Sequence, residues 1–379
     1  MRAASPFLAR FRRSLGATPR RGSVLVVVLV TLVLASIALT LFIERATDDL
    51  LVDARAADAR RLRLEAYSAL ETTLAVLQDF KQVNGGLRSP VEGWGEPLDW
   101  AGYEPQGNRR VTVAFEDESG KLSLPRASHE TLVALFDSWG LKKDEAERLA
   151  DALQQWAQPD YVPTSGLATD YDREKLPYQA PGRSLRSFSE LRAIAVAREV
   201  FYDEAGRPNE LWRRFVATVS LLNFAASNLN AAPAGTLAAC GLDEAKQALL
   251  ADYLAGTGSY RSQGAGYFRD EGEVTRVLGI SAPTGLGLEI QALRIRVTVR
   301  EGGGEFQLSA LFSPGGGAKA ITQKARTRRE DGTTPSATTP IEVARPAAAP
   351  ALNYPFTLLE IRENEEPLPE PATAEKNPV

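Results

Sequence analysis

The sequence predicts an α+β fold with a long N-terminal transmembrane helix, an antiparallel sheet and a large inserted α-helical domain. Three observations lead to this prediction. A charge-free segment runs from Ser23 to Ile43, strand-like alternation occurs in residues 110–124 and 292–312, and helical patterns fill the chain between those two regions. Neither group of strands is large enough to be stable alone, so we expect both to belong to one sheet that the helical domain interrupts.

The charge-free segment is long enough to cross a membrane, because a helix needs about 20 apolar residues to span the hydrocarbon core. The residues before it include no acid and six arginines: Arg2, Arg10, Arg12, Arg13, Arg20 and Arg21. Positive charge favours the cytoplasmic side, so we expect the body of the protein to lie outside the cytoplasm. A cleaved secretory signal ending at Ser36-Ile37-Ala38 is the alternative, but the apolar run continues past it.

The membrane helix is expected to continue into the soluble part of the protein. Neither Gly nor Pro occurs from Arg45 to Phe80, and apolar side chains recur there at helical spacing. The members of this packing stripe are Leu64, Tyr67, Leu70, Leu74 and Leu77. A helix over residues 23–80 would be on the order of 85 Å long.

The strands have clear local signals. Alternating apolar residues predict strands at 110–115 and 121–124, joined as a hairpin, and at 292–300 and 305–312, joined across glycines. Residues 354–361 are apolar enough to return as an edge strand.

The helices are predicted from caps and from apolar periodicity. One contains Leu149, Ala152, Leu153 and Trp156, and the expected starting residues of the others are Ser128, Ser187, Asn230 and Asp243. Ser187 and Glu190 have the spacing of a capping box.

These elements divide the chain into five parts. The predicted divisions are a basic leader at 1–22, the N-terminal helix at 23–80, a sheet domain at 81–126 and 260–362 with a flexible linker at 314–350, an inserted helical domain at 127–259, and a disordered acidic tail at 363–379.

Composition argues against nucleic acid binding and against catalysis. The net charge is -4, and removal of the six-arginine leader leaves about -10, which disfavours nucleic acid as a partner. His129 is the only histidine and Cys240 the only cysteine, so no disulfide within the chain and no transition-metal cluster is expected. A Ser-His-Asp triad would have to use His129, which stands at a helix start, so we expect no enzyme.

A DNA-binding module is the alternative function that we considered. Residues 228–254 form two short predicted helices joined at Gly241, as in a helix-hairpin-helix of a membrane-anchored competence or type IV pilus protein. Asp243 and Glu244 place two acids at the turn, and only Lys246 is basic nearby. A helix pair packed for structural reasons is the better interpretation.

The N-terminal organisation resembles the precursors of type IV pilins and of type II secretion pseudopilins. In that family a prepilin peptidase cuts after the glycine that ends a basic leader, which implies cleavage after Gly22 and a methylated mature N-terminus at Ser23. The family usually has Glu at the fifth mature position, where this chain has Val27. A missing carboxylate at that position is the pattern of the K-class minor pseudopilin at the filament tip.

Further segments are similar to motifs of the K class. Asp117–Pro125 looks like D-E-S-G-K-I-N-L-N with two departures, Trp156–Asp160 like W-I-D-P-D, Ser187–Arg192 like S-x-x-E-L-R, and Asn228–Ala232 like the helix start V-N-I-N-T-A. The resemblance implies a pilin-like fold, anchoring in the inner membrane with a periplasmic body, and partners of the I and J classes. We expect the packing stripe to bundle with the equivalent helices of those partners.

The resemblance also implies calcium as a cofactor, bound by an acidic loop. The candidate ligands are Asp160, Asp170, Asp172 and Glu174, which offer the oxygen atoms that calcium prefers. Two carboxylates of the family's loop are replaced here, by Gln158 and Thr169. A solvated acidic loop is the alternative interpretation.

Overall fold

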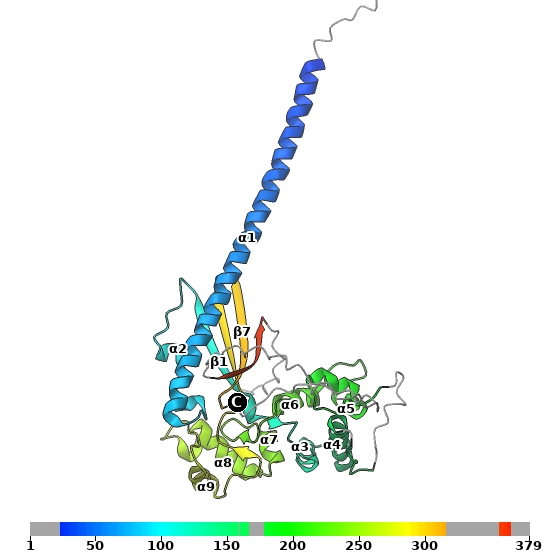
Figure 1. Cartoon of the computed structure of the whole chain (residues 1–379), viewed down its shortest axis with the longest axis vertical. Coiled ribbons are helices and arrows are strands. Elements are labelled where there is room, and N and C mark those ends of the chain that lie inside the picture. Colours follow the sequence, from blue (N-terminus) through cyan, green and yellow to red (C-terminus); the bar gives the residue numbers. More distant parts are fainter. Residues whose placement is uncertain (1–22, 159, 167–177, 316–355, 365–379) are drawn as a thin grey trace, which may run out of the picture. The chain divides into compact units, whose positions relative to one another are not determined.

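The computed structural model describes residues 23–158, 160–166, 178–315 and 356–364 (Figure 1). The chain divides into two compact units, residues 1–60 and 61–379, and each is described by itself. The first helix, α1 (Ser23–Asn84), begins in the first unit and ends in the second.

The part of α1 in the first unit exposes its side chains. Every residue from Leu25 to Ile43 is exposed, and by length and composition this helix could cross a membrane. It is the one helix with that property among the described residues. The helix ends four residues later than Phe80, at Asn84, where Gly85 adopts a left-handed conformation with φ 74°.

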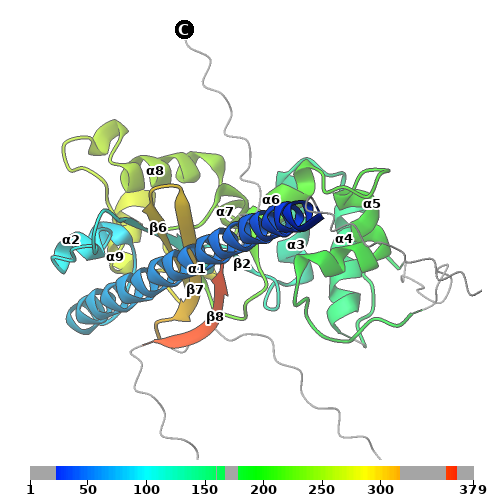
Figure 2. The same ribbon diagram turned by 90° about the horizontal axis from the view of Figure 1, so that it is seen from above.

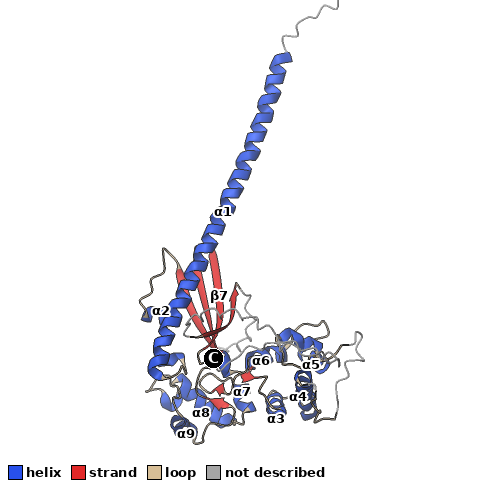
Figure 3. Ribbon diagram, viewed as in Figure 1, coloured by secondary structure: helices blue, strands red, loops and turns tan. Residues whose placement is uncertain are grey.

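The second unit is built on a four-stranded antiparallel sheet (Figure 3). Its strand order is β1 (Arg110–Asp117), β6 (Leu293–Glu301), β7 (Gly304–Ser313) and β8 (Thr357–Glu363). The structure confirms the hairpin of β6 and β7 and the return of the chain as an edge strand. Val113 pairs with Val297, so strands before and after the helical region share this sheet, as predicted.

The second part of α1 covers one face of the sheet. Alternate residues of β6 are fully buried beneath it, including Ile295, Val297 and Val299. The short helix α2 (Pro97–Trp100) follows α1 and adds Leu98 to the same core.

The helices between β1 and β6 form two separate cores rather than one (Figure 2). The first helical lobe contains α3 (His129–Ser138), α4 (Lys143–Ala157), α5 (Ala195–Phe201) and α6 (Glu210–Thr218). The second helical lobe contains α7 (Ala234–Ala239), α8 (Glu244–Ala255) and α9 (Glu271–Leu278). Ser128 and Asp243 cap α3 and α8 as predicted.

Two parallel strand pairs connect the lobes to the sheet domain. β2 (Leu122–Ser123) pairs with β3 (Val219–Ser220), and β4 (Ser227–Asn228) pairs with β5 (Leu286–Gly287). The predicted hairpin of 110–115 with 121–124 is therefore wrong. The 3-10 turn Glu118–Gly120 directs the chain out of the main sheet before residue 122.

Three other boundaries differ from the prediction. Residues 260–288 belong to the second helical lobe, because Val274 and Leu278 of α9 pack in the same core as Leu250. Asn230 does not open a helix; α7 begins later, after Pro233. The Ser187 cap opens a 3-10 helix (Phe188–Ala193) in which Glu190 accepts from the backbone of Arg186, so no capping box forms.

Leu77 and Leu64 provide a test of this packing. Leu77 is fully buried between α1 and the sheet, whereas Leu64 is 69% exposed on the same helix. Leu77→Ala should lower the free energy of unfolding by about 2–5 kcal/mol, through lost burial and a residual cavity. Leu64→Ala should change it by less than about 0.5 kcal/mol. Urea unfolding of the full chain in detergent, followed by tryptophan fluorescence, measures both; equal effects would contradict the arrangement.

Candidate functional site

The predicted processing site lies at the start of the described chain. Gly22 is outside the described residues, and Ser23 is the first residue of α1. Val27 is 58% exposed on the apolar part of that helix. The helix surface at the fifth mature position is therefore apolar.

The packing stripe faces the protein's own sheet rather than other subunits. Leu70, Leu74 and Leu77 are between 0% and 4% exposed and lie in the core shared with β6 and β7. Tyr67 is half-buried, and its hydroxyl donates to Glu363 of β8 at 2.7 Å. The prediction that these residues bundle with partner helices is wrong for all but Leu64, because the chain's own sheet already covers them.

The K-class motifs meet at the seam between the sheet and the second helical lobe. Asp117, at the end of β1, accepts hydrogen bonds from the backbone N–H of Ser119 at 2.9 Å and from the side-chain amide of Asn228 at 2.7 Å. The same amide donates to the backbone oxygen of Arg88 at 2.9 Å. Ser119 in turn accepts through its Oγ from the N–H of Gln291 at 2.8 Å. We call Asp117, Ser119 and Asn228 the clasp.

A second asparagine extends the clasp into the lobe. Asn230 accepts from the N–H of Phe268 at 2.7 Å and donates to the carbonyl oxygens of Phe268 and Leu288, each at 3.1 Å. Gly120 lies so close to Ala231 that a Cβ at this glycine would fall 2.6 Å from the backbone oxygen of Ala231. The D-E-S-G and N-x-N segments are therefore two sides of one close contact.

Burial shifts the pKa values of two acids in this region. It raises the pKa of Asp117 to about 6 even though Ser119 and Asn228 donate to the carboxylate. Burial also raises the pKa of Glu92, which accepts from the indole N–H of Trp94 at 3.0 Å. The motif resemblance pointed to Asp117 and Asn228, but nothing in the sequence indicated that they touch.

Most of the predicted calcium ligands lie outside the described residues. Asp170, Asp172 and Glu174 are among the undescribed positions, and Asp160 is exposed. Within the described ranges, no group of three or more His, Cys, Asp or Glu side chains could hold a metal ion. Calcium binding by this loop stays a prediction.

The start of the same loop is fixed by an acid that sequence analysis missed. Asp151 of α4 is buried and accepts from the hydroxyl of Tyr161 at 2.7 Å and from the N–H groups of Thr164 and Ser165 at 3.0 and 2.8 Å. His129 lies 3.2 Å from the same carboxylate. These hydrogen bonds lower the pKa of Asp151 against the opposing effect of burial, which is consistent with a structural anion rather than a catalytic base.

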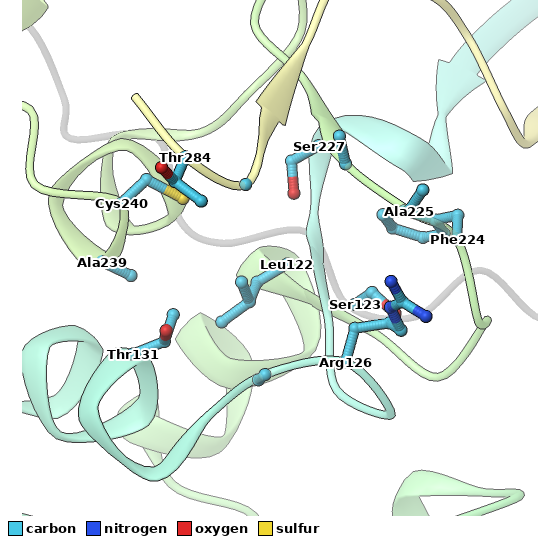
Figure 4. Close-up of a pocket in the computed structure, with 13 residues that line it drawn as sticks. Leu122, Ser123, Arg126, Thr131, Phe224, Ala225, Ser227, Ala239, Cys240 and Thr284 are labelled. Carbon is cyan, nitrogen blue, oxygen red and sulfur yellow. The ribbon is translucent and has the colours of Figure 1, made fainter. Parts of the chain in front are cut away.

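A small pocket of about 180 Å³ lies where both helical lobes approach the clasp (Figure 4). Cys240 and Thr284 line one side of it, and Arg126 and Phe224 line the other. Burial raises the pKa of the Cys240 thiol to about 11, so the thiol is protonated at neutral pH and is a poor nucleophile.

A single exposed apolar helix continues into a helix that packs on an antiparallel sheet, and helical lobes are inserted between the strands. The described chain thus combines one helix that could cross a membrane with an α+β body whose polar clusters hold segments together.

The family comparison matches one part of the chain. Residues 115–206 match the family model for protein K of the type II secretion system (T2SS). The matched residues include Asp117–Pro125, Trp156–Asp160 and Ser187–Arg192, three of the segments that resemble K-class motifs.

Other comparisons were less informative. The chain is similar to a chain in the crystal structure of the GspK–GspI–GspJ complex from the type 2 secretion system of enterotoxigenic Escherichia coli. The two are 16% identical, the match covers 83% of this chain and 99% of that one, and the TM-score is 0.48. No curated protein matches the chain.

The clasp predicts a pH-dependent stability. Because the folded protein binds the Asp117 proton more tightly than the unfolded chain does, the free energy of unfolding should fall as the pH rises from about 4 to about 6. Asp117→Asn should remove this contribution, which is on the order of 2–3 kcal/mol. Urea unfolding at several pH values measures the difference between the two proteins. A difference that stays constant across this range would contradict the prediction.

Proposed function

We propose that this protein is the K-class tip subunit of a periplasmic pseudopilus, anchored in the inner membrane and active in the assembly of a filament that exports folded proteins. The observation that carries the proposal is the protein K match over residues 115–206, in a chain that begins with an exposed apolar helix. Its role is structural: it offers packing surfaces to other subunits.

Val27 supports the position at the tip. In the family, a glutamate at the fifth mature position pairs with the terminal amine of a neighbouring subunit. A carboxylate in the bilayer costs roughly 2.5 kcal/mol or more, so it is retained only where it has a partner. A subunit with valine there offers no carboxylate to an incoming amine, which suits a subunit that starts or caps a filament.

Processing by prepilin peptidase tests the assignment directly. The mature protein should begin at Ser23, and Gly22→Leu should leave the leader attached, because a bulky side chain at the cleavage position blocks the peptidase. N-terminal sequencing and mass measurement of the full-length protein expressed with its peptidase distinguish the two forms. Cleavage after Ala38, or an intact Met1, would instead indicate an ordinary signal peptide or signal anchor.

The partners should be minor pseudopilins of the I and J classes. The outward face of α1 within the second unit carries Leu64, Ser68, Glu71 and Ala75, all of which are exposed. This face, rather than the buried stripe, is available to the helix of another subunit.

We expect the full chain, mixed in detergent with full-length I- and J-class proteins, to form a one-to-one-to-one complex. Leu64→Glu should weaken the complex at least tenfold, because it places a charge in a helix contact. Size-exclusion chromatography with light scattering measures the stoichiometry. Glu71→Gln is the control, because it alters a side chain on the same face without introducing a charge. Long homopolymers of this protein alone would contradict a tip subunit.

A further inference from the structure

An exposed aromatic surface lies where α1 ends and α2 follows. Trp100 exposes 65% of its surface and Val83 exposes 84%. The ring of Phe80 meets the ring of Trp100 edge-on, with 5.1 Å between the centroids. We call Phe80, Val83 and Trp100 the aromatic patch. An exposed tryptophan of this kind is uncommon away from binding surfaces.

The exposure of Trp100 does not come from a loosely held segment. Pro97 is buried and Leu98 packs against the core under α1, so α2 is held against the body of the second unit. Just beyond it, the hydroxyl of Tyr103 donates to the carboxylate of Glu65 at 2.6 Å. The anchors hold Trp100 outward, and little conformational entropy would be lost when a partner binds it.

Acidic side chains flank the patch. Asp79 precedes Phe80 on α1, Glu96 directly precedes α2, and Asp99 lies within α2; all three are exposed. None of them has an ion-pair partner among the residues that the structure describes. The main sheet differs: there Glu116, Glu118 and Glu360 are each paired with arginine or lysine.

The aromatic patch and its neighbouring acids favour a partner that presents a positively charged group beside apolar side chains. A tryptophan face attracts a guanidinium or ammonium group, and nearby carboxylates add hydrogen bonds and charge. Apolar side chains beside that cation would cover Val83 and Phe80. An arginine or lysine within an apolar surface meets both requirements.

We infer that the aromatic patch is the docking surface for a basic, apolar segment of a second pseudopilin subunit. The inference rests on the proposed function, because it takes the partner to be a subunit anchored in the same membrane. Phe80 and Val83 belong to α1, whose N-terminal residues form the anchor. A neighbouring subunit with its own anchor is held alongside this helix, which a freely diffusing secreted protein is not.

The test uses the full chain in detergent and a purified pair of full-length I- and J-class subunits as the probe. Trp100→Ala should weaken binding at least tenfold by biolayer interferometry. Raising NaCl from about 50 to about 500 mM should weaken binding of the unmodified protein, because salt screens exposed charges. The double variant Glu96→Gln, Asp99→Asn should bind less tightly at low salt and should lose most of the salt dependence.

Matched variants elsewhere control for general surface effects. Leu249→Ala removes an apolar side chain that is 42% exposed on α8, and Glu199→Gln with Glu204→Gln neutralises two exposed acids of the first helical lobe. Both should bind within twofold of the unmodified protein.

Each other outcome overturns the inference. If the unmodified chain binds the pair and the patch variants bind equally well, the docking surface is elsewhere and the proposed function stands. If the unmodified chain does not bind the pair, both the inference and the proposed partners fail. If Trp100→Ala binds the pair normally but abolishes secretion, the patch serves the secreted protein rather than a subunit.

Discussion

The burial of one face of α1 beneath the four-stranded sheet is the constraint on which the rest of the second unit depends. Leu70, Leu74 and Leu77 lie at helical spacing, and the alternate residues of β6 meet them from the sheet. The apolar residues of α1, which follow the helical period of 3.6, and those of β6, which follow the strand period of 2, therefore meet at one surface. This packing fixes which face of α1 remains exposed.

The helical lobes are attached to this core by hydrogen bonds rather than by a continuous apolar interface. The clasp joins the end of β1 to β4, and Asn230 ties the second lobe to the segment leading into β6. Hydrogen bonds between buried polar groups are directional and costly to leave unmade, so they specify one arrangement of the segments. Two of the segments that resemble K-class motifs, Asp117–Pro125 and Asn228–Ala232, thus meet at the seam of the molecule.

The acids of the molecule fall into three physical settings. Asp117 and Glu92 are half-buried, and desolvation raises the pKa of each. Asp151 is buried as well, but its donors lower the pKa and keep it an anion that holds the start of the acidic loop. The acids around the aromatic patch are exposed and unpaired within the described chain, and for that reason they are available to a partner.

The sequence by itself determined the anchor, the strands of the main sheet and the caps of α3 and α8. These features depend on local composition, on periodicity and on side chains that bond to their own backbone, all of which can be read within a short window.

Only the tertiary structure decided that the chain's own sheet covers most of the packing stripe, that residues 122–123 leave the main sheet, and that the helical insert has two cores. An apolar stripe has the same pattern whether it faces its own sheet or another subunit. Likewise, nothing local distinguishes a strand that pairs with β1 from one that pairs with β3, about a hundred residues away. The contact of Asp117 with Asn228 joins residues 111 positions apart, so the clasp exists only once the chain has folded.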